Sequence, residues 1–330
     1  MLSQVTLMRI GISAVLAAAV VLIAAWPLGG LRRLRRLSGE VINPDLPERY
    51  RSKAGTPTMG GIFILLGFAV GALAVGGIDV LGIVLVTLAF GAIGVLDDML
   101  AQRRGRSLGL KARQKLLLQA IPAAAYVYWS MRTHHLLVVG WPGVWMVEVG
   151  SLYVLLGVLF ILFMSNAVNL SDGMDGLAAG LTVLCGVPLA VLSSAAAGVA
   201  SFSKGAPIAA AALSGACVGF LCLNAYPALV FMGDTGSLAI GACLAAVAIS
   251  TGTEALLLVL GAVFAAELLS VAVQVVSFKT TGRRVFRMSP LHHHFDQCGW
   301  PEPQIVKMFW LAGAAASAVC IVLAGITGGF

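Results

Sequence analysis

The sequence contains very little charge. Asp, Glu, Lys and Arg make up 11% of its 330 residues, whereas 59% of the residues are apolar. A soluble globular domain carries about 25% charged residues, so a soluble enzyme is excluded. The high apolar content also excludes a disordered chain, and the 39 glycines show no collagen-like period of three. A protein that crosses a membrane several times remains.

The alternation of polar and apolar residues that a membrane β-barrel needs is also missing. A bias towards Ala, Leu, Val and Gly indicates helices instead. Cys-x-x-Cys pairs are absent, and five of the six cysteines lie in apolar stretches. We therefore expect the cysteines to act as small buried hydrophobic residues rather than as disulfides or metal ligands.

Long uncharged runs separate the few charged segments, and we expect one membrane-spanning helix in each of them. The ten runs are 10–31, 54–78, 80–96, 116–131, 149–171, 176–203, 205–233, 235–253, 255–278 (interrupted by Glu267) and 308–330. The uncharged stretch 133–147 contains His, Trp, Pro and Gly and is expected to be an interfacial loop. The sequence thus predicts one all-α integral-membrane domain over residues 1–330 with ten transmembrane helices.

The basic residues predict how these helices are oriented. Segments 32–53, 103–115 and 279–307 hold seven, six and five of the 21 basic residues, and with ten helices all three lie on one side. By the positive-inside rule this side is cytoplasmic, so both termini are expected on the outer side. The net charge of +7 then reflects topology, and we expect no nucleic-acid partner.

Polar residues cluster in all five predicted cytoplasmic loops. The clusters are 51–61, 94–98, 166–176, 224–237 and 289–296. A lipid or sugar transporter would more often place its ionisable residues near the bilayer midplane. The pattern favours an enzyme with its active site at the cytoplasmic face, and a transporter is the alternative.

Five acids in these clusters suit a metal site. They are Asp97, Asp98, Asp172, Asp175 and Asp234. Neighbouring carboxylates repel each other and so favour a bound cation. Ligands that offer only oxygen are typical of Mg²⁺, which binds one or two carboxylates together with substrate phosphates. The alternative is that these acids only end helices and remain solvated.

Several uncharged side chains in the same loops are candidates for substrate binding. The amides of Asn166, Asn169 and Asn224 suit a nucleobase, a sugar or a carboxylate. Phe231 suits either stacking on a base or a place in the core. Thr58 either contacts a ligand or caps the following helix.

Cationic and imidazole groups complete the candidates. Lys53 and Lys115 are expected to pair with a diphosphate or with anionic lipid headgroups. His292, His293 and His294 cannot all bind one metal if they are helical, because consecutive side chains diverge. Contact with a phosphate or sugar fits them better, and a solvated polar loop is the alternative.

Two polar side chains fall within the run 255–278. Glu267 is either a functional acid or a buried structural hydrogen-bond partner. Gln274 lies seven residues further along, nearer the cytoplasmic end, and is able to reach the site.

These segments together resemble the family of phospho-N-acetylmuramoyl-pentapeptide transferases, a branch of the polyprenyl-phosphate N-acetylhexosamine-1-phosphate transferases. The matching segments are 53–61, 97–98, 166–176, 224–237 and 286–295, and the resemblance covers essentially the whole chain. The aspartate segments are typical of the whole superfamily. The run Ser-Pro-Leu-His-His-His looks specific to the muramoyl-pentapeptide branch.

The resemblance implies a multi-pass enzyme of the bacterial inner membrane. It would transfer phospho-N-acetylmuramoyl-pentapeptide from its UDP carrier to undecaprenyl phosphate, giving lipid I and UMP, the first membrane step of peptidoglycan synthesis. Mg²⁺ as the cofactor, contact with membrane lipid and a homodimer are also implied. A sibling enzyme that uses UDP-N-acetylglucosamine is the alternative, and the histidine segment argues against it.

The resemblance further implies roles for single residues. Asp234 is expected to be the leading Mg²⁺ ligand, Asp98 a second carboxylate for the metal or the lipid phosphate, and Asp97 the base that deprotonates the polyprenyl phosphate. A mechanism with a carboxylate as nucleophile stays open. The nucleoside side of the pocket would include Lys53, Asn169, Asp175, Asn224, Phe231 and Gln274, and the sugar-phosphate or peptide side His292, His293 and His294.

One position departs from the family pattern. Family members usually have Lys three residues after the second Asp of the pair, and here that position is Ala101. Either Arg103 or Arg104 takes over the phosphate contact or that lysine is dispensable. Lys115 matches another lysine of the family.

Overall fold

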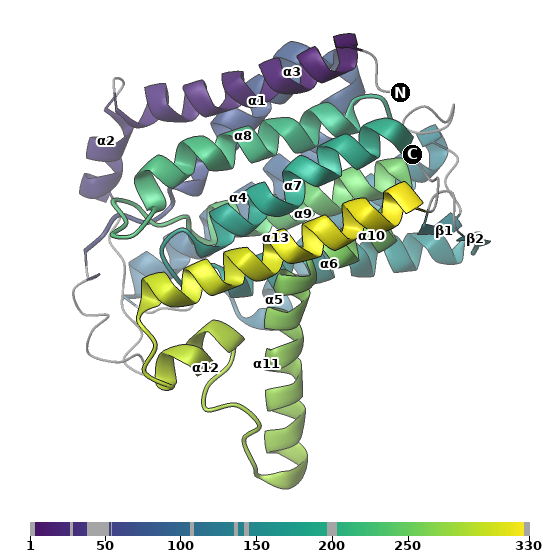
Figure 1. Cartoon of the computed structure of the whole chain (residues 1–330). Helices are drawn as coiled ribbons and strands as arrows, with labels where there is room; N and C mark the ends of the chain where they lie inside the picture. Colours follow the sequence, from purple (N-terminus) through teal and green to yellow (C-terminus); the bar gives the residue numbers. More distant parts are fainter. Residues whose placement is uncertain are drawn as a thin grey trace.

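The structure, a computed structural model, describes residues 4–26, 29–37, 53, 55–105, 109–134, 138–141, 145–196 and 203–326. These residues are almost entirely helical (Figure 1). The helices are α1 (Gln4–Ala25), α2 (Gly30–Leu37), α3 (Gly61–Gly76), η2 (Gly77–Val80), α4 (Leu81–Arg104), α5 (Ala112–His134), α6 (Leu152–Ser171), α7 (Leu177–Ala196), α8 (Ala206–Asn224), α9 (Gly233–Thr251), α10 (Glu254–Leu260), α11 (Ala262–Thr281), α12 (Leu291–Gln297) and α13 (Glu302–Ile326).

Eight stretches of the described residues are long and apolar enough to cross a membrane. One of them, Gly61–Arg104, is 44 residues long and contains two helices, α3 and α4, which meet at a turn begun by Gly77. The helix α5 is 23 residues long but is not among the eight, since basic residues lie near both of its ends. An all-α polytopic membrane protein is thus the observed fold class, whereas the count of ten and the orientation stay predictions.

Two segments differ from what the sequence predicts. The run 255–278 is not one helix, because the chain breaks at Gly261 into the short α10 and the longer α11. The stretch 133–147 contains two antiparallel strands, β1 (Val138–Trp141) and β2 (Trp145–Glu148), with Val138 opposite Glu148. Val and Trp favour strands, and their abundance on both sides of a Pro-Gly pair explains the hairpin.

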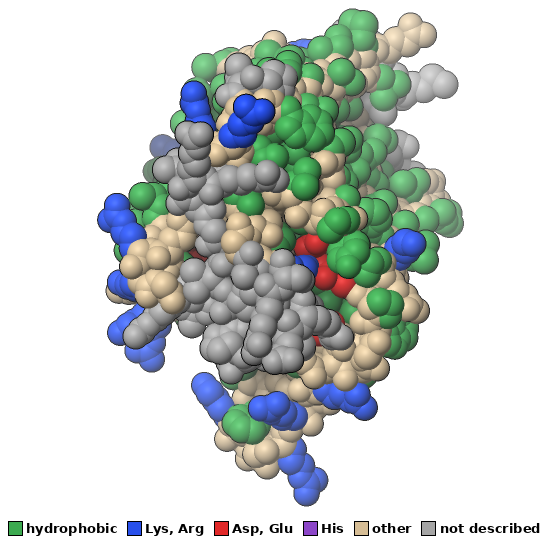
Figure 2. Space-filling model, turned by 90° about the vertical axis from the view of Figure 1, so that its left-hand side faces the viewer, with side chains coloured by type: hydrophobic (Ala, Val, Ile, Leu, Met, Phe, Trp, Pro, Cys, Tyr) green, Lys and Arg blue, Asp and Glu red, His purple; other side chains and the backbone are tan. Residues whose placement is uncertain are grey.

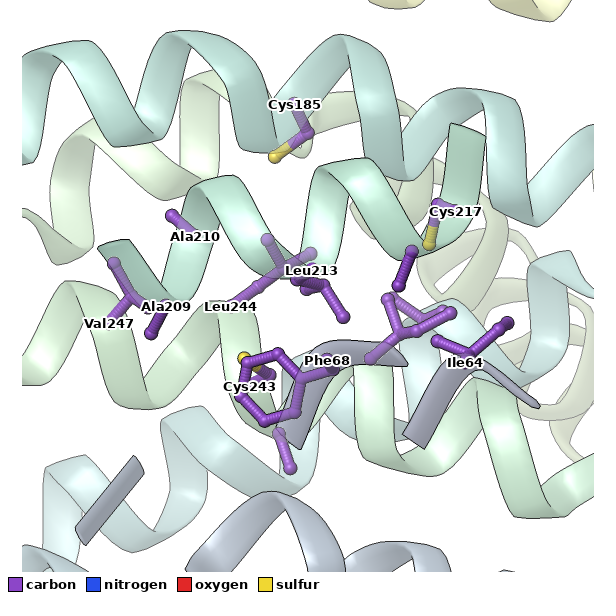
Figure 3. Close-up of a cluster of buried hydrophobic side chains, with 14 of the residues drawn as sticks. Ile64, Phe68, Cys185, Ala209, Ala210, Leu213, Cys217, Cys243, Leu244 and Val247 are labelled. Carbon is purple, nitrogen blue, oxygen red and sulfur yellow. The ribbon is translucent and has the colours of Figure 1, made fainter. Parts of the chain in front are cut away.

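The core of the bundle is built on α8 and α9. Every residue of α9 from Thr235 to Thr251 is buried. The helices α1, α3 and α7 pack against α8, and α4 and α6 pack against α9. Figure 3 shows side chains that meet there, with Phe68 of α3 close to Leu213 of α8 and Leu244 of α9.

All six cysteines are free. Burial is confirmed for Cys185, Cys217, Cys243 and Cys320. It is wrong for Cys222, which also lies in an apolar stretch but is exposed.

The two ends of the bundle hold different helices. The first residues of α1 and the last of α13 lie at one end, while α2 and α12 lie at the other, and α11 points away from the bundle (Figure 1). Viewed onto the end with α2 and α12, Lys and Arg side chains surround a central group of acids (Figure 2). The helix ends that meet there position the candidate site.

Candidate active site

The end of α4 meets the beginning of α9 through Asp98. The Asp98 carboxylate accepts hydrogen bonds from the backbone N–H groups of Asp234 and Thr235, both at 3.0 Å, and from the Thr235 hydroxyl at 2.6 Å. Helix N-termini carry unpaired N–H groups and partial positive charge, so a carboxylate is well placed there. Asp98 therefore caps α9 from a neighbouring helix.

Glycines allow the backbones to approach this closely. A Cβ atom on Gly94 of α4 would lie 2.2 Å from the carbonyl oxygen of Asp234, and one on Gly61 of α3 would lie 2.1 Å from the backbone nitrogen of Gly236. Real Cβ atoms do not approach backbone atoms to such distances. The three helices can cross at the carboxylates only because these residues have no side chain.

The segments around Thr58 and Phe231 are joined by three backbone hydrogen bonds. The N–H groups of Gly60 and Gly61 donate to the carbonyls of Phe231 and Met232 at 2.8 and 2.9 Å, and the N–H of Phe231 donates to the carbonyl of Pro57 at 2.8 Å. These bonds hold Thr58 close to the beginning of α9.

Thr58 does not cap the following helix. The N-cap of α3 is Gly60, and no side chain caps it. The Thr58 hydroxyl instead borders Gly233, where an added Cβ would lie 3.0 Å from it. The structure therefore places Thr58 beside the carboxylates.

Lys115 of α5 lies among oxygen atoms from three helices. Its ammonium nitrogen is 2.5 Å from Asp234 Oδ2, 3.1 Å from Asn169 Oδ1 and 3.5 Å from Asp97 Oδ2. The Asn169 amide also donates to Asp234 Oδ1 at 2.6 Å and to Ser237 Oγ at 2.9 Å. Asp97, Asp98, Asp234, Lys115 and Asn169 thus come together, and we call this group the carboxylate cluster.

Gly109 and Leu110, which precede α5, lie beside Asp97 and Arg104 of α4. Leu110 donates its backbone N–H to Asp97 Oδ1 at 2.5 Å, and Arg104 donates to the carbonyl of Gly109 at 2.6 Å. Arg104 therefore helps to hold Gly109 and Leu110 in place beside Asp97.

A second cluster contains Lys53, Asp175 and Glu302. The Lys53 ammonium lies 2.6 Å from both Asp175 Oδ1 and Glu302 Oε1. The backbone N–H of Asp175 donates to the same Glu302 oxygen at 2.8 Å, and Asp175 Oδ2 accepts from the N–H of Ala228 at 2.9 Å. Segment 166–176 therefore contributes to both clusters, since Asn169 belongs to the carboxylate cluster and Asp175 to this second one.

Asn224 and Phe231 belong to the segment from the end of α8 to the beginning of α9, beside the second cluster. Asn224 accepts from the N–H of Gly176 at 3.0 Å and donates to the carbonyl of Val230 at 2.9 Å, so it orders the loop before α9. The Lys53 ammonium lies 5.7 Å from the centre of the Phe231 ring. A planar ring beside a paired lysine is a suitable surface for a base to stack on.

The histidine segment docks onto Glu267. Glu267 is fully buried in α11, and its Oε1 accepts from the backbone N–H of His292 at 3.3 Å and lies 3.2 Å from His292 Nδ1. The other face of the His292 ring lies against Gly173, where a Cβ would be 2.2 Å from Nε2. His294 accepts from the N–H of Arg287 at 3.1 Å.

Three of the predicted residues lie outside these contacts. Asn166 lies one turn before Asn169 in α6 and donates to Gln119 Oε1 at 2.8 Å. Gln274 holds backbone groups of residues 285 and 286 through three hydrogen bonds of 2.8 to 2.9 Å. Asp172 follows the last residue of α6, and its N–H donates to the carbonyl of Asn169 at 3.3 Å.

The sequence interpretation missed Thr235 and Glu302. Thr235 follows Asp234 directly, so its place at a helix N-terminus was the available signal. No sequence signal indicated Glu302, because it stands alone between two prolines, far along the chain from Lys53.

We expect Asp98→Asn to lower the free energy of unfolding by about 2–3 kcal/mol, because it removes the charge that caps α9 and replaces an acceptor with a donor. Thermal unfolding in detergent micelles measures this. Asp79→Asn, at an exposed acid, is the control for loss of one charge. An unchanged melting temperature for Asp98→Asn would contradict the capping role.

Replacement of Glu267 by Leu should loosen α12, because it leaves two buried donors of His292 without an acceptor, each at a cost of about 1–3 kcal/mol. Glu267→Gln keeps the accepting oxygen and should stay close to the parent protein. Thermal unfolding and limited proteolysis around α12 compare the two. Equal losses in both variants would show that the charge matters rather than the acceptor.

Burial lowers the pKa of His293 to about 3, and the charges of His292 and Lys53 act in the same direction. A histidine in the unfolded chain has a pKa of about 6.5, so the unfolded chain binds a proton that the folded chain does not. Stability should fall as the pH drops from about 6.5 towards 3. His293→Gln should make this fall shallower in unfolding curves measured across that range, and an identical pH dependence would contradict the assignment.

Comparisons with known proteins agree with the resemblance. Residues 80–252 match the family model described as glycosyl transferase family 4, and residues 53–65 match the phospho-N-acetylmuramoyl-pentapeptide-transferase signature 1. The chain is 46% identical over 317 residues to the phospho-N-acetylmuramoyl-pentapeptide-transferase of Heliobacterium modesticaldum, covering 94% of this chain and 96% of that protein. It is 44% identical over 322 residues to the protein of that name from Moorella thermoacetica, with the same coverage.

Proposed function

The chain belongs to the phospho-N-acetylmuramoyl-pentapeptide transferase family, and from this premise we propose its reaction. It transfers phospho-N-acetylmuramoyl-pentapeptide from a UDP carrier to undecaprenyl phosphate, and the products are lipid I and UMP. The observation that carries the proposal is the identity of 46% over 94% of the chain to a relative of that name. The grouping of acids and lysines at one end of an apolar bundle supports it.

The site has to balance the charge of a diphosphate. In the reaction an oxygen of the lipid phosphate attacks the phosphorus that bears the sugar, and the bond from this phosphorus to UMP breaks. Such transfers depend on positioning and charge stabilisation more than on covalent help from the protein. Lys115 supplies one positive charge within the carboxylate cluster, and Lys53 a second on the side of Phe231.

The carboxylate cluster fits Mg²⁺ by its donor chemistry. Within the described part of the chain, no group of three His, Cys, Asp or Glu side chains is arranged to hold a metal. Mg²⁺ does not need such a group, because it binds through one or two carboxylates plus substrate phosphates and water. Asp234 and Asp98 are the proposed ligands, and bound Mg²⁺ would neutralise the charge that develops on the diphosphate.

Asp97 is the proposed proton acceptor for the lipid phosphate. Its Oδ1 is fixed by the N–H of Leu110, while its Oδ2 faces Lys115 at 3.5 Å. Asp98 is a poorer nucleophile or base, because three of its roughly four acceptor positions already hold hydrogen bonds from α9. Because Asp97 is the better base and Asp98 is held by α9, direct transfer is favoured over a covalent intermediate on Asp98.

The Lys53 cluster is the proposed nucleoside side of the pocket. Phe231 offers a face for the uracil ring, and Asn224 and Asp175 hold the surrounding loops. His293 is the histidine best placed for substrate, since Lys53 influences it electrostatically and His292 is occupied by Glu267. With a pKa lowered to about 3, His293 would contact the substrate as a neutral imidazole.

The remaining assignments concern the membrane. We propose ten transmembrane helices in the bacterial inner membrane, with the carboxylate cluster at the cytoplasmic face. Both helix ends that bound the described chain lie at the opposite end of the bundle, which accords with an even number of crossings (Figure 1). A homodimer is part of the same proposal.

The decisive experiment measures UMP release by the purified protein with undecaprenyl phosphate, UDP-N-acetylmuramoyl-pentapeptide and Mg²⁺. We expect release that stops with EDTA and returns with Mg²⁺. No release from folded protein would refute the proposal. Preference for UDP-N-acetylglucosamine would instead identify the sibling enzyme, and lipid movement without UMP release would identify a transporter.

A further inference from the structure

A groove between α4 and α5 lies far from the carboxylate cluster. Its volume is about 480 Å³, within the range of small-molecule sites. Leu85 of α4 and Pro122 of α5 are among its lining residues. Leu85 precedes Asp97 by twelve residues, or roughly 18 Å of helix. The groove is therefore separate from the proposed reaction and does not depend on it.

The lining of this groove is apolar. Its polar side-chain groups are the Trp129 indole N–H and the Tyr126 hydroxyl, and the hydroxyl is already engaged with the carbonyl of Ala246 at 2.9 Å and with Ser250 Oγ at 2.5 Å. The other side chains of the lining are all apolar, so an occupant that is mostly hydrocarbon fits the groove best.

Pro122 of α5 and Gly82 of α4 help to shape the groove. Pro122 lies inside α5, where it removes a helical hydrogen bond and bends the helix. Gly82 lies opposite Trp129, and a Cβ on Gly82 would be 2.2 Å from the indole ring. The missing side chain makes room for the indole, which forms one wall. The lining extends along α4 from Leu81 to Ala89, roughly 12 Å of helix, so a long, narrow chain fits this space.

The position of the groove indicates that its hydrocarbon occupant comes from the lipid bilayer. Leu85 is 58% exposed and lies on α4, which belongs to a candidate membrane span, so the groove opens towards lipid. Arg132 is exposed one turn beyond Trp129, with its guanidinium 6.0 Å from the centre of the Tyr128 ring. A hydrocarbon slot followed by a cation matches an acyl chain followed by a phosphate.

We infer that this groove binds a phospholipid of the surrounding bilayer. One acyl chain lies between α4 and α5, and the phosphate pairs with Arg132. Because α4 carries Asp97 and α5 carries Lys115, the lipid holds together the far ends of two helices whose near ends form the carboxylate cluster.

A photoreactive lipid tests the inference on the full chain. The protein is placed in phosphatidylcholine vesicles with a trace of phosphatidylglycerol that carries a diazirine in its acyl chain. After illumination, we expect label concentrated on residues 78–89 and 122–129. Ala125→Trp fills the groove and should reduce this label at least about ten-fold, equivalent to about 1.4 kcal/mol. Ala124→Trp is the matched control, because Ala124 is exposed but does not line the groove.

A second measurement distinguishes loss of lipid binding from misfolding of the variant. Phosphatidylglycerol added to detergent should raise the melting temperature of the parent protein and of Ala124→Trp, but not of Ala125→Trp, since a ligand stabilises only a protein that binds it. Leu85→Trp serves as an independent filling variant. Arg132→Gln should lower the labelling by phosphatidylglycerol.

Two results would overturn the inference. Even labelling of all lipid-facing helices, unchanged by Ala125→Trp, would show that the groove holds only bulk lipid. Loss of the label on addition of undecaprenyl phosphate would assign the groove to a polyprenyl chain instead of a phospholipid.

Discussion

Asp234→Asn should reduce the rate of UMP release by at least about a thousand-fold, as expected when a group that organises the charge around a phosphoryl transfer is lost. Asp234 meets both Lys115 and Asn169 and stands next to Asp97 and Asp98 at the beginning of α9. Loss of its charge weakens the proposed first ligand of Mg²⁺ and leaves Asp97 as the one carboxylate paired with Lys115 among the described residues. The measurement is UMP release at saturating Mg²⁺ and lipid phosphate.

The Asp234→Asn protein should remain as stable as the parent protein, whereas Asp98→Asn should lose stability. An asparagine at position 234 still offers an oxygen to Lys115, and Asp98 still caps α9 through backbone N–H groups. The melting temperature should therefore stay near that of the parent protein. Asp79→Asn, an exposed acid outside the cluster, is the control and should keep full activity. Turnover of Asp234→Asn near the parent rate would rule out its proposed role.

Much of the helical framework could be predicted from the sequence because long apolar runs have few other stable forms in a membrane. The sequence also predicts that Asp97, Asp98 and Asp234 share one end of the molecule. The sequence does not predict which partner each of these three acids contacts. Neighbouring residues of a helix point roughly 100° apart, and only the packing of α4 against α9 and α5 places Asp98 at the N-terminus of α9 and Asp97 beside Lys115.

The sequence also does not predict that polar residues of one motif belong to two different clusters. Asp175 and Asn169 lie six residues apart in one motif, yet one pairs with Lys53 and the other with Lys115. The break at Gly261 was not predicted either, since a lone glycine within an apolar run does not end a helix by itself. Long-range contacts decide such features, and a sequence pattern records only local ones.

Gly94→Ala should lower the free energy of unfolding by about 3 kcal/mol or more, the cost of forcing extra volume into a packed core. By helix propensity alone the change should stabilise α4 by about 1 kcal/mol, so the two effects predict opposite signs. The Cβ would lie 2.2 Å from the carbonyl oxygen of Asp234 and 2.5 Å from the Cα of Thr235, and neither backbone atom can rotate aside. The helices α4 and α9 must then separate, which pulls Asp98 from its hydrogen bonds.

Gly11→Ala provides the matched control for this substitution. Gly11 is also inside a helix, α1, but nothing lies within 4 Å of an added Cβ, so only the propensity gain should remain. Denaturant unfolding in micelles should therefore rank Gly11→Ala at or above the parent protein and Gly94→Ala well below it. UMP release should fall with Gly94→Ala even at temperatures where the variant is folded, because separation of the helices displaces Asp98 from Asp234. A Gly94→Ala protein as stable and active as Gly11→Ala would show that the glycine crossing does not position the carboxylates.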